Sequence, residues 1–156
     1  MEYRSRAARA LVRLQVDELR GLLVVWEEAR RRELPLPPSD DPDYASLDAL
    51  LLHALRSSRG YLNWICEFGE RTAPRIELPK ERIGEQAAGC LERLADAWET
   101  ACADISVEEM DSAEVKKTRW QVPFALESMF EHAVVHPMRH RFQLQELMDE
   151  KGRAGA

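Results

Sequence analysis

Apolar residues recur at three- and four-residue steps through four long stretches of this chain, and this periodicity constrains the fold more than any other feature. The stretches cover residues 4–32, 45–68, 80–104 and 123–149. A helix with such a stripe buries it against other helices, because one turn takes 3.6 residues. We therefore predict an all-α protein in which the four helices pack as a four-helix bundle.

Proline-rich and aspartate-rich segments mark the connections between these helices. Residues 34–43 contain four prolines and three aspartates and are predicted to form a loop. Either Ser46 or Asp43 is a suitable cap for the helix that follows. A glycine and two prolines mark the connection at 69–79. The long connections leave room for a topology other than simple up-and-down.

Residues 106–121 follow no clear helical period. We predict a short extended or hairpin segment near residues 115–122. Pro123 is then suited to be the first residue of the last helix, because the first turn of a helix needs no backbone N–H there. At 156 residues the chain fits one domain, predicted at 1–150, with residues 151–156 as a flexible tail.

Composition excludes some classes of function. The net charge of −6 argues against a nucleic-acid partner, which needs a basic face. The longest apolar runs are far too short to cross a membrane. Three cysteines without a Cys-x-x-Cys motif, and no apolar leader at the N-terminus, predict a cytoplasmic protein with reduced thiols. Two of them, Cys90 and Cys102, fall in the apolar stripe of the third stretch and are predicted to be buried.

Three of the four histidines lie in the last helical stretch, at His132, His136 and His140. Four residues advance about 40° around a helix, so the three side chains do not point the same way. His136 and His140 fall inside the apolar stripe, and His132 falls at its rim. Two histidines spaced by four on one helix face can bind one metal ion.

A third ligand has to come from another helix, where His53 is the only remaining histidine. It lies to one side of the apolar stripe of the second helix, together with Ser57, Gly60 and Trp64. The small residues leave space beside a ligand, so we interpret these three as candidate walls of a substrate cavity. Three neutral imidazoles suit zinc, nickel, iron or copper.

Other interpretations of these side chains remain open from spacing alone. Buried histidines are often hydrogen-bonded core residues that bind no metal. His132 is either a residue that hydrogen-bonds the site and shuttles a proton or a solvent-facing helix residue. The remaining tryptophans, Trp26, Trp98 and Trp120, are predicted to be core or packing residues.

Two segments resemble a known family. "HAVVHPMRHRFQL" resembles the last-helix signature of the DinB/YfiT-like superfamily, and "LLLHALRSSRGYLNW" is similar to its second-helix segment. The resemblance covers the whole chain in length and helix order, but only these two segments are specific. It implies a four-helix bundle with a long crossover connection and a divalent metal bound by His53, His136 and His140.

The resemblance also implies a class of activity. Members include transferases and isomerases that use low-molecular-weight thiols, and metal-dependent hydrolases, and they often form homodimers. By this resemblance the chain acts on a small-molecule substrate at a site that holds one divalent metal, with zinc or nickel favoured and iron also suitable. The alternative is a non-catalytic protein of the stress response that binds a metal or small ligand at a vestigial site.

The chain departs from the family pattern at two positions. Pro137 stands where the family more often has glycine or serine, and a proline here removes one helix hydrogen bond and predicts a kink between the two histidines. Phe142 replaces a glycine and falls on the outer face of the helix, where it is suited to an interface. Both departures bear on the substrate more than on the metal.

Overall fold

The computed structural model describes residues 2–154, and these are mostly helical, which confirms the all-α prediction. Four helices are long, and two 3-10 helices, η1 (Pro42–Tyr44) and η2 (Gly84–Gln86), precede the second and third of them. The long helices are α1 (Arg6–Arg31), α2 (Leu47–Phe68), α3 (Ala87–Cys102) and α5 (Leu126–Ala154). A single turn, α4 (Val107–Met110), and two short strands, β1 (Lys116–Lys117) and β2 (Pro123–Phe124), lie between α3 and α5.

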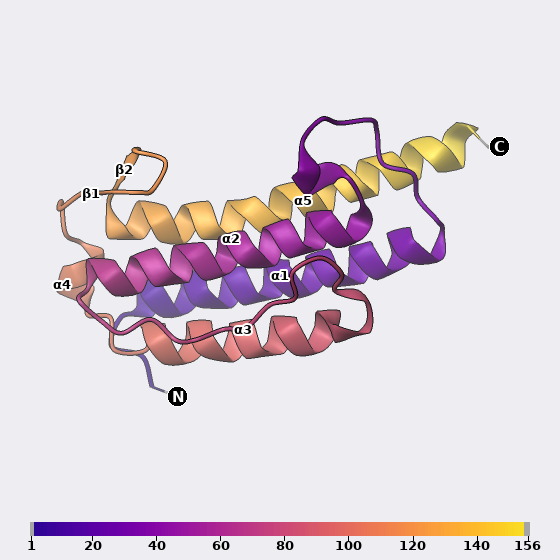
Figure 1. Ribbon diagram of the computed structural model, residues 1–156. Helices are drawn as coiled ribbons and strands as arrows, with labels where there is room; N and C mark the ends of the chain where they lie inside the picture. The colour runs from indigo at the N-terminus through magenta and orange to yellow at the C-terminus, as the bar shows by residue number, and fades with distance from the viewer. Residues whose placement is uncertain (1, 155–156) are drawn as a thin grey trace.

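The four long helices lie side by side, with α1 packed against α2, α3 and α5 (Figure 1). Helices α1 and α5 run in one direction, and α2 and α3 run in the other. The connection at 69–83 therefore returns along the length of α2 before α3 begins (Figure 1). This arrangement sets α5 against α2, and the two helices that carry the histidines are neighbours.

Apolar side chains from all four long helices form one core. Trp26, Trp98 and Phe130 are the largest fully buried side chains, so the prediction that Trp26 and Trp98 pack in the core is confirmed. One buried polar cluster crosses this core. The Ser58 hydroxyl accepts hydrogen bonds from the Gln15 amide at 2.8 Å and from the Trp98 indole at 2.9 Å, which satisfies both donors.

Helix ends follow the predicted caps in part. Ser46 caps α2, since its hydroxyl accepts a hydrogen bond from the Ala49 backbone N–H at 3.1 Å. Asp43 is not the cap, because its carboxylate lies against a histidine ring. The third helix begins at Ala87, later than predicted, because the chain turns at Gly84 with a φ of +41° and then forms η2.

The predicted hairpin between α3 and α5 is present, but the segments just before and just after it differ from the prediction. Pro123 does not start a helix; it pairs with Lys117 in the two-stranded sheet, where a missing N–H is tolerated. Before the hairpin, α4 begins with a capping box between Ser106 and Glu109, a signal present in the sequence that the interpretation missed. Helix α5 continues to Ala154, so residues 151–154 of the expected tail are helical, and residues 155 and 156 lie outside the described part.

The three cysteines, Cys66, Cys90 and Cys102, are free and buried, as predicted for Cys90 and Cys102. Over residues 2–154, every helix is too short or too polar to cross a membrane.

Candidate metal centre

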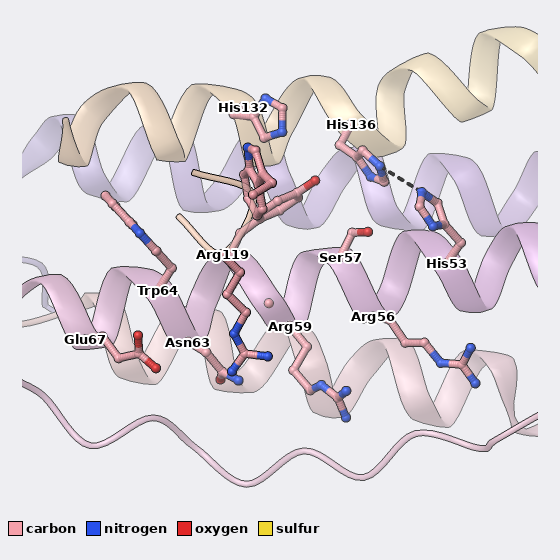
Figure 2. Close-up of a pocket in the computed structure, with 13 residues that line it drawn as sticks. His53, Arg56, Ser57, Arg59, Asn63, Trp64, Glu67, Arg119, His132 and His136 are labelled. Carbon is pink, nitrogen blue, oxygen red and sulfur yellow. Dashed lines mark hydrogen bonds between the residues drawn. The ribbon is translucent and has the colours of Figure 1, made fainter. Parts of the chain in front are cut away.

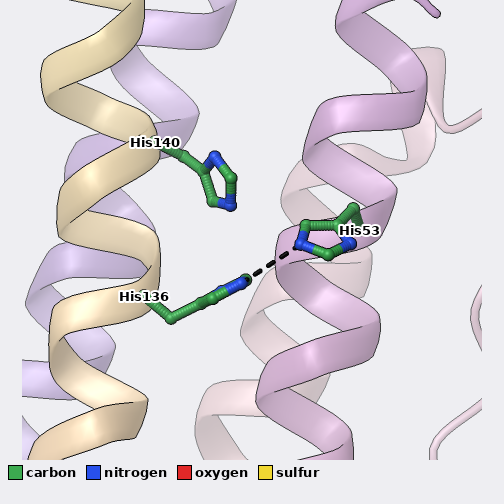
Figure 3. Close-up of side chains that lie close together, drawn as sticks. All are labelled: His53, His136 and His140. Atoms are coloured by element: carbon green, nitrogen blue, oxygen red, sulfur yellow. Dashed lines mark hydrogen bonds between the residues drawn. The ribbon is translucent and has the colours of Figure 1, made fainter. Parts of the chain in front are cut away.

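Packing of α2 against α5 brings three histidines together. His53 projects from the second turn of α2, whose start is fixed by the Ser46 cap. His136 and His140 project from α5 one turn apart, and all three rings point toward one another (Figure 3). His132 is left outside this group, as its position on the helix wheel predicted.

The ligand nitrogens of this histidine triad (His53, His136 and His140) lie close together. One ligand nitrogen from each ring lies within 4.8 Å of the other two. The Nε2 atoms of His53 and His136 are 3.1 Å apart (Figure 3). Two nitrogens bound to zinc at about 2.0–2.1 Å with tetrahedral angles are separated by about 3.3 Å. The triad is therefore close enough to bind one metal ion.

In two of the three rings, a side-chain oxygen contacts the outer nitrogen, which is the Nδ1 atom that faces away from the triad. The Asp43 carboxylate lies 2.7 Å from Nδ1 of His53, and the Gln143 side-chain oxygen lies 3.0 Å from Nδ1 of His140. Both oxygens only accept hydrogen bonds, so each Nδ1 donates one, and in the neutral ring the lone pair is then on Nε2. Metal-binding histidines are oriented in this way by a carboxylate or carbonyl behind the ring.

His136 differs from the other two because its outer nitrogen has no such acceptor. Among the described residues its Nδ1 is buried without a hydrogen-bond partner. With a lone pair on Nε2 of His53, the 3.1 Å contact is a hydrogen bond that His136 Nε2–H donates. Binding of a metal through this nitrogen requires its proton to move to Nδ1.

Burial keeps the two triad histidines of α5 neutral. His140 is fully buried, and His136 is partly buried. Burial, followed by the neighbouring histidines, lowers the pKa of His136 to about 3. Burial also lowers the pKa of His140 to about 4, although the Gln143 hydrogen bond raises it in part. Neutral imidazole is the form that binds a metal.

The nitrogen atoms of the triad fit a metal ion in their chemistry. Within residues 2–154, Nε2 of His140 is buried, faces the triad and has no hydrogen-bond partner. An orphaned lone pair in this position costs free energy unless a cation or proton meets it. Three imidazoles leave further coordination positions for water or substrate, which is the composition of a catalytic rather than a closed structural site.

A cavity of about 390 Å³ opens beside the triad between α2, the hairpin and α5. His53 and His136 form its inner end, and the predicted wall residues Ser57, Gly60 and Trp64 all line it. Figure 2 shows the α2 side chains along one wall and the α5 histidines on the other. A small molecule in this cavity would lie next to the triad.

His132 also lines this triad cavity, further from the metal position. Its ring lies edge-on to Tyr61 at 5.1 Å and to Phe124 at 5.4 Å between ring centres. Burial, followed by the positive charge of Arg139, lowers the pKa of His132. His132 is therefore a half-buried residue that faces the triad cavity, and its lowered pKa favours the neutral ring.

Trp120 is a packing residue and not a core residue, since its ring meets those of Tyr61 and Phe124, each at 6.2 Å between ring centres. Its side chain is 49% exposed and lines the triad cavity from the hairpin. Sequence reasoning also assigned no site role to Asp43, Gln143 and Arg119. Gln143 follows His140 by three residues, which places it one turn along α5, so helical spacing could have identified it. The positions of Asp43 and Arg119 depend on loops and carried no such signal.

The fold and the site together define an all-α protein with a candidate three-histidine metal centre. No family model matches this chain, and neither the curated proteins nor the solved structures include a match.

Proposed function

We propose that this protein is a metal-dependent enzyme of the DinB/YfiT-like type, with the four-helix bundle and long crossover connection of that superfamily. One observation carries the proposal. The triad nitrogens lie within 4.8 Å of one another, and Asp43 and Gln143 hold the rings of His53 and His140 with their Nε2 atoms turned toward the triad. A core histidine pair without a metal needs no such arrangement.

Each residue has a separate task in the proposed reaction. The triad binds a divalent transition metal, and zinc or nickel is favoured, with iron also suitable. A bound divalent metal lowers the pKa of a water molecule or of a low-molecular-weight thiol and so supplies a nucleophile at neutral pH. The triad cavity holds a small electrophilic substrate, and His132 on its wall accepts or returns a proton.

Metal content is the first test. We expect the purified protein, reconstituted with zinc and desalted, to retain about one equivalent of metal, because three imidazoles converge on one point. A His136→Ala, His140→Ala double variant should retain less than a tenth of that amount. The matched control is His132→Ala, which removes a histidine from the same helix outside the triad and should retain the metal. Equally low metal in wild type and double variant would refute the proposal.

Activity is the second test and separates an enzyme from a binding protein. Zinc-loaded and nickel-loaded protein should accelerate either thiol addition to an electrophile or hydrolysis of an ester, and the double variant should not. A protein that binds the metal but shows no turnover with thiols or with water would instead be a non-catalytic metal-binding protein.

We further propose that the protein forms homodimers through the outer face of α5. Val135 and Phe142 are half exposed there and, seven residues apart, lie on the same face. We expect light scattering at about 100 μM to give twice the mass of the chain, and Phe142→Glu to reduce it to one chain, because a charge in an apolar interface is costly. Val107→Glu, at an equally exposed valine of α4, is the control. A monomeric wild-type protein would contradict the proposal.

A further inference from the structure

The tip of the hairpin, residues 118–122, lies at the triad cavity and is closed by hydrogen bonds of its own. Thr118 is buried and clamps the turn: its backbone N–H donates to the Val122 carbonyl at 2.9 Å, and its hydroxyl accepts from the Val122 N–H at 3.2 Å. Gln121 adopts a backbone φ of +65°, which is uncommon for residues other than glycine. This closed turn presents Arg119 and Trp120 to the cavity.

Trp120 and Trp64 form an apolar wall of the cavity. The Trp120 ring meets Tyr61 edge-on at 6.2 Å and stays half exposed. The Trp64 indole N–H points to the Lys117 carbonyl at 3.4 Å, which ties α2 to the hairpin. A half-exposed indole such as that of Trp120 favours stacking of a planar group, and cavities that bind small molecules combine such walls with few polar groups.

The charges that line the cavity are mainly positive, although the whole chain carries −6. Arg56, Arg59 and Arg119 line it against one acidic residue, Glu67. Among the described residues no carboxylate lies within 4.0 Å of any of these arginines. Arg56 and Arg59 donate to backbone carbonyls of the 69–83 connection, which are neutral, so their positive charge remains uncompensated.

We propose that the triad cavity binds a small anionic molecule with a planar body, whose carboxylate or phosphate pairs with Arg119 while the body packs on Trp120 and Trp64. A guanidinium matches both anions through two parallel hydrogen bonds. This inference deepens the proposed function, because the bound molecule would lie between Arg119 and the metal position at His136. The hairpin tip is then the segment that selects the substrate.

Binding of three probes tests the proposal: trans-cinnamate, phenyl phosphate and the neutral cinnamamide. Affinities are measured by calorimetry on the zinc-loaded and on the metal-free protein, together with zinc content. We expect at least one anion to bind at least about tenfold more tightly than cinnamamide, and added salt to weaken it. The two anions distinguish a carboxylate from a phosphate ligand.

Variants assign the contacts. Arg119→Gln should weaken the preferred anion at least about tenfold, which corresponds to about 1.4 kcal/mol, and leave cinnamamide unaffected. Arg13→Gln is the matched control, since this arginine is 79% exposed on α1 away from the cavity. Trp120→Ala should weaken all three probes, because stacking on the ring is lost. Circular dichroism checks that each variant is folded.

Several outcomes would overturn the inference. These are no binding by any probe, equal binding of anions and cinnamamide, or an unchanged anion affinity in Arg119→Gln. Anion binding that needs zinc but not Arg119 would place the anion on the metal and would also reject it. Arg119-dependent binding to a protein that retains no zinc would support the anion site while refuting the proposed metal function, so the two failures can be told apart.

Discussion

Substitution of Asp43 tests whether this carboxylate orients His53 for metal binding. Its carboxylate lies 2.7 Å from Nδ1 of His53 and fixes the tautomer in which Nε2 faces the other histidines. Replacing Asp43 by alanine leaves the His53 ring free to carry its proton on either nitrogen and to rotate. Neutral forms with the proton on Nε2 then present N–H rather than a lone pair to the metal. We expect zinc to bind more weakly although no ligand has been changed.

The expected loss of zinc affinity depends on how exposed the side chains of Asp43 and His53 are. Loss of a group that orients a metal ligand commonly costs about 10- to 100-fold in metal affinity. The side chains of Asp43 and His53 are 44% and 25% exposed, so water replaces part of the lost hydrogen bond. We therefore expect about a tenfold loss, or about 1.4 kcal/mol. Asp43→Asn should fall between wild type and Asp43→Ala, because its amide oxygen still accepts a hydrogen bond.

Competition with a chromophoric zinc chelator at neutral pH measures this affinity. Asp40→Asn is the control, because it removes the same charge three residues earlier, whereas the carboxylate paired with His53 is that of Asp43. Nitrogen chemical shifts of the histidine rings in the metal-free protein report the tautomer directly, and His53 should carry its proton on Nδ1 in wild type. An Asp43→Ala variant that binds zinc as tightly as wild type would refute the reasoning.

Two further predictions concern the stability of the metal-free protein. The unfolded chain protonates its histidines near pH 6.5, whereas His136 and His140 stay neutral in the fold until about pH 3 and about pH 4, so the unfolding free energy should fall as pH decreases through this window. Urea unfolding at several pH values should show a shallower decline in the His136→Ala, His140→Ala variant, and equal slopes would contradict the burial argument. Ser58→Ala should lower the unfolding free energy by about 3 kcal/mol, because two buried donors lose their shared acceptor. Ser57→Ala, one position along α2 on the cavity wall, should cost less than about 1 kcal/mol, and a similar loss in both variants would argue against the buried network.

Much of the fold could be read from local patterns in the sequence. The spacing of apolar residues located the four long helices, because an amphipathic stripe repeats with the turn of the helix itself. The same local geometry separated the inward pair, His136 and His140, from His132 at the rim. Ser46 was one of two candidate caps for α2 for an equally local reason, since a cap bonds to backbone only three residues away, and the structure selects it over Asp43.

Helix boundaries next to loops were less predictable. Pro123 suits both a first helical turn and the end of a short strand, because its fixed φ is compatible with both. In the structure Pro123 belongs to a strand, because residues 123–124 pair with Lys116 and Lys117. The start of α3 at Ala87 similarly depends on a turn at Gly84 that no apolar period reveals.

The sequence by itself determined that this chain folds into long amphipathic helices and that His136 and His140 share one buried face. Only the tertiary structure decided three further features. His53 lies next to this pair, the Asp43 carboxylate contacts Nδ1 of His53, and Trp120 lines a cavity instead of packing in the core. The physical reason is distance along the chain. Helical periodicity relates residues three or four positions apart, whereas the contact between His53 and His136 joins segments 83 residues apart and exists only when α2 and α5 pack together.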